Sequence, residues 1–174
     1  MKDASKTPAD EVLRQDRLLF YKEDIDGIDQ ILTEFLRMSG AKCALLIDKD
    51  GHLVTRCGEV LTIDMDTISA LVAGSFAATR EMARLLGEQE FSALFHQGKR
   101  DNIQLSLVGE RTLLTVLFDD RTTVGMVRLY AGDTSKKLAT LYEKCLAKMD
   151  EPGSLDLGEG YGDSAKSTLE SLFD

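Results

Sequence analysis

The chain has 174 residues, of which 43% are hydrophobic and 29% charged, a composition typical of a globular protein with one buried core. Its formal net charge is −9, and no basic stripe is present to neutralise phosphates, which argues against nucleic-acid binding. No run approaches the ~18 apolar residues that span a bilayer, and the first residues lack an apolar signal core, so we expect a cytoplasmic protein without membrane insertion.

The chain begins with an extension over residues 1–20, in which Pro8 could start a weakly apolar helix. The main domain is expected over residues 21–149. Its first helix is predicted from about Lys22 to Met38, because apolar residues recur there at helical spacing, and Gly40 suits its end.

Two strands should follow, over residues 41–48 and 53–57, and Asp50-Gly51 between them is a strong hairpin signal. A long second helix is predicted from Asp64 to Leu86. Either Thr62 or Asp64 can cap its start, and Gly87 can close it.

Residues 88–101 are predicted to be an irregular connection with an apolar anchor. Three strands should come next, over residues 103–107, 113–118 and 124–130, and a third helix over 135–149. The order α-β-β-α-β-β-β-α with short turns predicts an α/β (α+β) fold, in which a five-stranded antiparallel sheet carries helices on both faces.

The C-terminal end carries most of the negative charge. Residues 150–174 hold seven acids and one lysine, a net −6, so residues 1–149 carry the remaining −3. The glycines among these acids predict a flexible linker over 150–163. Residues 164–174 then form a short amphipathic segment, which is either disordered or a tethered motif that folds into a partner's groove.

The second helix has two different sides at ~100° per residue. The side expected to pack on the sheet holds Ile68, Leu71, Val72, Ser75, Phe76, Met82 and Leu86. The opposite side holds the small residues Ala70, Ala73, Gly74 and Ala77, where charges would be usual on a solvated face.

Gly74 in mid-helix costs ~1 kcal/mol relative to Ala, so a close contact should compensate for it. That contact could come from another helix of this chain or from a second chain, such as a homodimer partner. Arg80, Glu81 and Arg84 return this side to charge. They could form the rim of an interface or simply a solvated helix end.

The sequence contains no convincing catalytic or metal-binding constellation. Residues 160–167 resemble a phosphate-binding loop, but its second glycine is replaced by Ala165. The histidines and cysteines match no metal-ligand spacing. We therefore expect a non-catalytic protein with no cofactor, no metal and no catalytic residues of its own.

Several motifs together carry a family likeness. They are residues 44–54 (ALLIDKDGHLV), Ala73-Gly74, residues 95–98 (FHQG) and residues 117–128 (LFDDRTTVGMVR). In order and spacing they resemble the roadblock/dynein light chain family, and within it the bacterial gliding-motility regulators. The likeness spans roughly residues 21–149, and residues 169–173 also resemble the C-terminal end of those relatives.

The resemblance implies the fold derived above and a homodimer in which sheets join and second helices lie side by side. It implies that the dimer binds a small Ras-like GTPase of cell polarity in its GTP-bound state. Such relatives activate GTP hydrolysis by repositioning the GTPase's own catalytic residues, without an arginine finger. A non-activating scaffold or adaptor is the alternative, because Arg80 and Glu81 stand where close relatives keep small residues.

The partner-binding residues follow from the helix pattern and from this resemblance. In the second helix they are Ala70, Ala73, Gly74, Ala77, Arg80, Glu81 and Arg84, and in the C-terminal segment Leu169, Leu172 and Phe173.

Overall fold

The structure is a computed structural model that describes residues 22–59 and 62–150. The elements are α2 (Lys22–Ser39), β1 (Cys43–Asp48), β2 (Leu53–Gly58), α3 (Met65–Leu86), β3 (Ala93–Gln97), β4 (Asn102–Val108), β5 (Thr112–Phe118) and α4 (Val124–Asp150). The expectations for residues 1–20, 151–163 and 164–174 lie outside the described residues. Contacts divide the chain within α4, after Leu141, and the packing described below is that of the part before this point.

The five strands form one antiparallel sheet in the order β2-β1-β5-β4-β3. The central strands β1 and β5 are buried along almost their whole length, which explains their nearly continuous apolar sequence. Their register pairs Leu46 with Leu114 and Ala44 with Val116. The edge strands β2 and β3 are more exposed.

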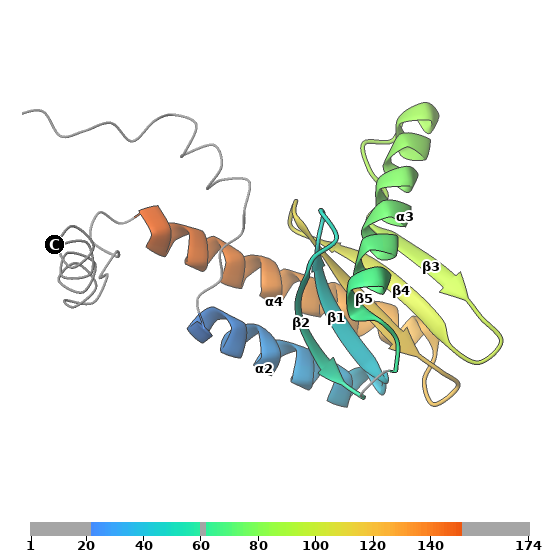
Figure 1. Cartoon of the computed structure of the whole chain (residues 1–174), viewed down its shortest axis with the longest axis horizontal. Coiled ribbons are helices and arrows are strands. Elements are labelled where there is room, and N and C mark those ends of the chain that lie inside the picture. The colour runs from blue at the N-terminus through green and yellow to red at the C-terminus, as the bar shows by residue number, and fades with distance from the viewer. Residues whose placement is uncertain (1–21, 60–61, 151–174) are drawn as a thin grey trace, which may run out of the picture. The chain divides into compact units, whose positions relative to one another are not determined.

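Helices cover both faces of the sheet (Figure 1): α2 and α4 lie on one face and α3 on the other. Between α2 and α4, Lys137 Nζ lies 3.4 Å from Glu34 Oε2. On the α3 face, one core cluster joins the helix to the sheet through the buried residues Cys43, Leu45, Ile47, Val72, Phe76, Leu105 and Leu113. The predicted fold class, element order and two-faced helix arrangement are confirmed.

Two segments differ from the expectation. Residues 124–130, predicted to be a strand, form the first turns of α4. The sheet still has five strands because β3 forms within residues 88–101, which were predicted to be irregular. The backbone N–H of Met126 donates to the Thr123 hydroxyl (3.3 Å), an N-terminal capping contact that starts the helix early. Val127, Ala131 and Leu138 are buried at helical spacing.

The ends of α3 are those that the sequence predicts. Asp64 caps the helix, with its carboxylate accepting from the backbone N–H of Asp66 and from the Thr67 hydroxyl. These hydrogen bonds lower the pKa of Asp64, and the one from the Thr67 hydroxyl has the largest effect. At the other end Gly87 adopts a left-handed conformation (φ 77°), which glycine takes without strain. In the described part of the chain, no helix is long and apolar enough to span a membrane.

Candidate partner-binding surface

The helix α3 is rotated about its axis relative to the expected packing. Its buried residues are Ser69, Val72, Ala73, Phe76, Thr79 and Ala83. Leu71, Met82 and Leu86, which were expected to pack on the sheet, are 64%, 51% and 72% exposed. The side of α3 that packs on the sheet is therefore centred on Val72 and Phe76 and is turned away from Leu71, Met82 and Leu86. Next to this side, a turn of the backbone approaches α3 closely.

That close approach involves the turn between β1 and β2. Gly51 in this turn has φ 93°, and a Cβ placed on it would lie 3.0 Å from the Cα of Ala70 and 3.6 Å from the Cβ of Ala73. Ala73 itself is only 6% exposed. The expectation that Ala73 is open in a single chain is therefore wrong, because this chain's own hairpin turn covers it.

The remaining small residues of the predicted site are exposed. Ala70, Gly74 and Ala77 are all exposed. At Gly74, no heavy atom apart from the helix's own nearby backbone lies within 4 Å of the position that a Cβ would take. The expectation that this chain leaves Gly74 uncovered agrees with the geometry.

Larger apolar side chains extend this surface along the helix. Leu71, Ala78, Met82 and Leu85 are exposed on the same side as Gly74, and Leu85 is 79% exposed. We define the outer face of α3 as Ala70, Leu71, Gly74, Ala77, Ala78, Met82 and Leu85. The exposed Glu81 lies among them, between Ala77 and Leu85. Exposed apolar residues gathered on one helix face mark an interaction surface more often than scattered ones do.

The charged residues of the predicted site form ion pairs. Arg80 donates through Nε and Nη2 to Oε1 of Glu90, at 3.1 and 2.9 Å, and Arg84 donates through Nε to Glu81 at 3.1 Å. Glu90 lies in the connection to β3, and its role has no local signal in the sequence because it is ten residues away from Arg80. Both pairs are exposed, so each contributes little to stability.

A groove runs along one flank of α3, beside the outer face. Its volume is about 120 Å³, and its lining consists of Lys49, Asp50, Ala73, Phe76, Ala77, Arg80, Leu107, Arg111 and Leu113. The turns between β1 and β2 and between β4 and β5 supply its charged rim together with Arg80. The sequence pattern predicts three of its four α3 residues, Ala73, Ala77 and Arg80, as partner-binding, and it does not predict the turn residues, because the turns meet the helix only in the folded chain.

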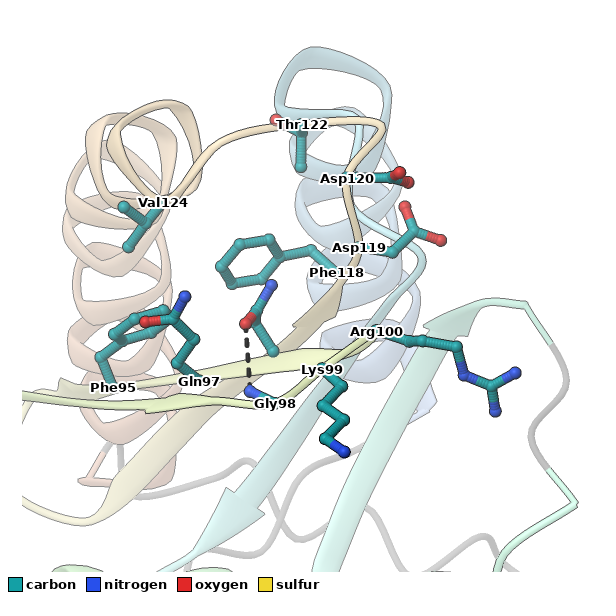
Figure 2. A pocket seen from close by; sticks show the side chains of 11 residues that line it. Phe95, Gln97, Gly98, Lys99, Arg100, Phe118, Asp119, Asp120, Thr122 and Val124 are labelled. Atoms are coloured by element: carbon teal, nitrogen blue, oxygen red, sulfur yellow. Dashed lines mark hydrogen bonds between the residues drawn. The ribbon is translucent and has the colours of Figure 1, made fainter.

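A second hollow, of about 290 Å³, lies between the turn from β3 to β4 and the connection from β5 to α4 (Figure 2). The rings of Phe95 and Phe118 are stacked at its base, with centroids 6.1 Å apart, and Val124 adds an apolar wall. Figure 2 shows the side chains of Lys99 and Arg100 directed away from the hollow. The carboxylates of Asp119 and Asp120 also line it, so the hollow combines an apolar base with acidic residues at one side.

Ion pairs tie the strand ends together next to this hollow. Lys42 lies 2.8 Å from Asp101 and 3.7 Å from Asp119, while Arg121 lies 2.9 Å from Asp119 and 2.7 Å from Glu59. The hydrogen bond from Arg121 lowers the pKa of Asp119, and the Asp119 and Glu59 carboxylates raise the pKa of Arg121. These ion pairs hold the loops next to the hollow together.

The described residues offer little chemistry of their own. Within residues 22–59 and 62–150, no three His, Cys, Asp or Glu side chains come together as metal ligands. Burial raises the pKa values of the Cys43 and Cys57 thiols, which keeps them protonated and poorly nucleophilic at neutral pH. The predicted contacts of Leu169, Leu172 and Phe173 lie outside the described residues.

Comparisons with known proteins agree with the fold and with the elements that build this surface. The model of the Roadblock/LC7 domain matches residues 27–118. MglB of Myxococcus xanthus and the gliding protein MglB of Thermus thermophilus are each 35% identical, with a TM-score of 0.68, over 73% of this chain and 96% of theirs. An MglB solved in a tetrameric arrangement is 34% identical, with a TM-score of 0.69 and the same coverage. The chain belongs to the Roadblock/LC7 domain family.

Proposed function

We propose that the protein is a homodimeric, cytoplasmic regulator of a small Ras-like GTPase and accelerates GTP hydrolysis by that GTPase. The observation that carries the proposal is the exposed outer face of α3, on which Gly74 has no covering atom and Leu71 and Leu85 face solvent. An apolar helix face of this kind needs another chain against it. The likeness to MglB, whose name denotes a gliding protein, supports a role in bacterial polarity or motility.

The homodimer would use α3 and the edge strand β3. Only one side of β3 is paired within the sheet, since β4 is its sole neighbour among the described strands, so its outer backbone groups are available to a second copy. Pairing two β3 strands across a two-fold axis would join the sheets and bring the two α3 helices side by side. The tetrameric arrangement of one MglB supports self-association in this family.

The GTPase would bind across the paired α3 helices in its GTP-bound state. The regulator would supply no catalytic group and would reposition the GTPase's own switch residues. Residues 164–174 would dock on a separate GTPase surface, with the linker raising their effective concentration.

The test is single-turnover GTP hydrolysis by the small Ras-like GTPase of the same organism, with and without this protein. We expect acceleration by the wild type and none by Gly74→Arg or Ala77→Arg, because an arginine there would block the outer face. Gly132→Arg in α4 is the matched control, since Gly132 is also an exposed helical glycine with open space around it. Persistent acceleration by Gly74→Arg, or equal loss in Gly132→Arg, would contradict the proposal.

A non-activating scaffold is the second candidate. It is favoured by the position of Arg80 and Glu81, since both side chains stay exposed, with Glu81 within the outer face and Arg80 beside it, where the GTPase would bind. A scaffold predicts binding to the GTPase loaded with the analogue GppNHp, with an unchanged rate of GTP hydrolysis. Replacing Arg80 and Glu81 by alanine together should then create or raise activation if these two side chains are the obstacle.

A further inference from the structure

The groove on the flank of α3 differs from the outer face in its charge. Its floor is apolar and includes Phe76, Leu107 and Leu113. Four charged residues line it, and three of them are cations: Lys49, Arg80 and Arg111 stand against Asp50. The groove therefore combines an apolar floor with a predominantly basic rim.

Lys49 and Arg80, two of the cations at the rim, differ in whether they form an ion pair. Lys49 makes no ion pair within residues 22–59 and 62–150, so its ammonium is available to a ligand carboxylate. Arg80 is paired with Glu90, but this pair is exposed and weak, so an incoming carboxylate can compete with Glu90 for the guanidinium. An anion could therefore bind here without breaking a buried ion pair.

The size of the groove argues for a protein side chain as its occupant. Its volume of about 120 Å³ is well below the ~300–1,000 Å³ of typical small-molecule sites. It suits a single aliphatic side chain with a carboxylate next to it. Ala77 belongs both to the groove wall and to the outer face of α3, so a chain bound on that face can reach the groove without a gap.

We propose that this groove receives an acidic segment of the bound GTPase, in which a Leu- or Ile-type side chain enters the groove and a neighbouring carboxylate meets Lys49. The inference rests on the proposed function and adds to it the chemistry by which one GTPase is selected over another. The outer face supplies apolar contact area, and the groove selects by charge. Lys49 attracts a GTPase with a carboxylate at that point and repels one with a basic residue there.

The test compares Lys49→Glu with Lys99→Glu. Both lysines are exposed and both variants change net charge equally, but Lys99 lies in the turn between β3 and β4 and is directed away from the hollow there. Binding to the GTPase loaded with GppNHp is measured at 50 and 300 mM NaCl. We expect Lys49→Glu to weaken binding about fivefold at low salt and less at high salt, and Lys99→Glu to change it less than about twofold.

The outcomes separate the two proposals. If wild-type protein does not bind the loaded GTPase, the proposed function fails and this inference fails with it. If wild-type protein binds and both glutamate variants weaken binding equally, the groove inference alone is wrong, because the effect is then long-range charge. If Lys49→Glu instead changes homodimer dissociation, measured by sedimentation equilibrium, a second copy occupies the groove and the inference is overturned.

Discussion

The two exposed helical glycines provide a paired test of whether another chain lies against α3. An alanine at Gly74 or at Gly132 would meet no atom within 4 Å apart from the helix's own local backbone, so neither substitution has a steric cost in one subunit. Alanine is favoured over glycine in a helix interior by about 0.8–1 kcal/mol. In an isolated subunit, both variants should therefore be more stable by nearly this amount.

The two variants should separate when the protein is concentrated enough to dimerise. If a second backbone approaches Gly74 closely, a new methyl group there pushes the two chains apart, and dimerisation then offsets the helix gain. Gly132 belongs to α4, which lies on the other face of the sheet (Figure 1), so Gly132→Ala should keep its gain. A difference of about 1 kcal/mol between the variants corresponds to about 2–4 °C in the unfolding temperature for a chain of this size.

The assay is urea denaturation of wild type and both variants over a hundredfold range of protein concentration, because dimer stability depends on concentration. We expect the two glycine variants to match at the lowest concentration and to diverge as concentration rises. If Gly74→Ala keeps its full gain at every concentration, no backbone lies against Gly74, and the argument from its position is refuted.

Four further predictions concern the core, the ion pairs and the tail. Leu45→Ala removes a fully buried side chain and should lower the free energy of unfolding by about 2–5 kcal/mol in urea denaturation. Folding lowers the pKa of Asp119, so its ionised carboxylate stabilises the folded protein at pH values above its unfolded-state pKa of about 3.9. This stabilisation is lost as the pH falls through its folded-state pKa. Asp119→Asn should therefore destabilise the protein at pH 7, and the difference from wild type in thermal melts should shrink towards pH 2. Glu90→Gln removes the charge that pairs with Arg80, so Arg80 leaves residue 90 more easily, and GTPase binding should tighten about twofold in calorimetry, whereas weaker binding would show that the pair must stay closed. Deleting residues 164–174 should weaken that binding without lowering the unfolding temperature.

Much of the fold is predictable because local signals and burial agree. The apolar runs of β1 and β5 identify the central strands, and the Asp64 and Gly87 caps identify the ends of α3. The strand β3 is hard to predict because an exposed edge strand carries little alternation, and its five residues include two that are only half-buried and none that is buried. Residues 124–130 favour a strand in sequence because their valines and tyrosine suit one, while the start of α4 depends on a single cap at Thr123.

The candidate site is predictable in part, and the error lies in the rotation of α3. This helix is apolar on two sides, one with Val72 and Phe76 and the other with Leu71 and Leu85, so periodicity alone does not decide which side meets the sheet. The decision comes from Gly51, a residue of the opposing turn, whose missing side chain lets the helix backbone come close. The groove residues Lys49 and Arg111 have the same origin, since separate turns bring them to the helix only after folding.

This packing changes which residues support an interface on α3. Ala73 is small because the hairpin turn lies against it, so its size needs no second chain. Gly74, one position further along the helix, faces away from the turn and gains nothing from the subunit's own contacts. Leu85 is left 79% exposed on the same side, although burying a leucine side chain is worth about 1.5–3 kcal/mol. A glycine in the middle of a helix and exposed leucines on the same face both cost free energy that a single subunit does not recover. Contact with another chain recovers both, and this is the physical reason to place the homodimer and the GTPase on the outer face of α3.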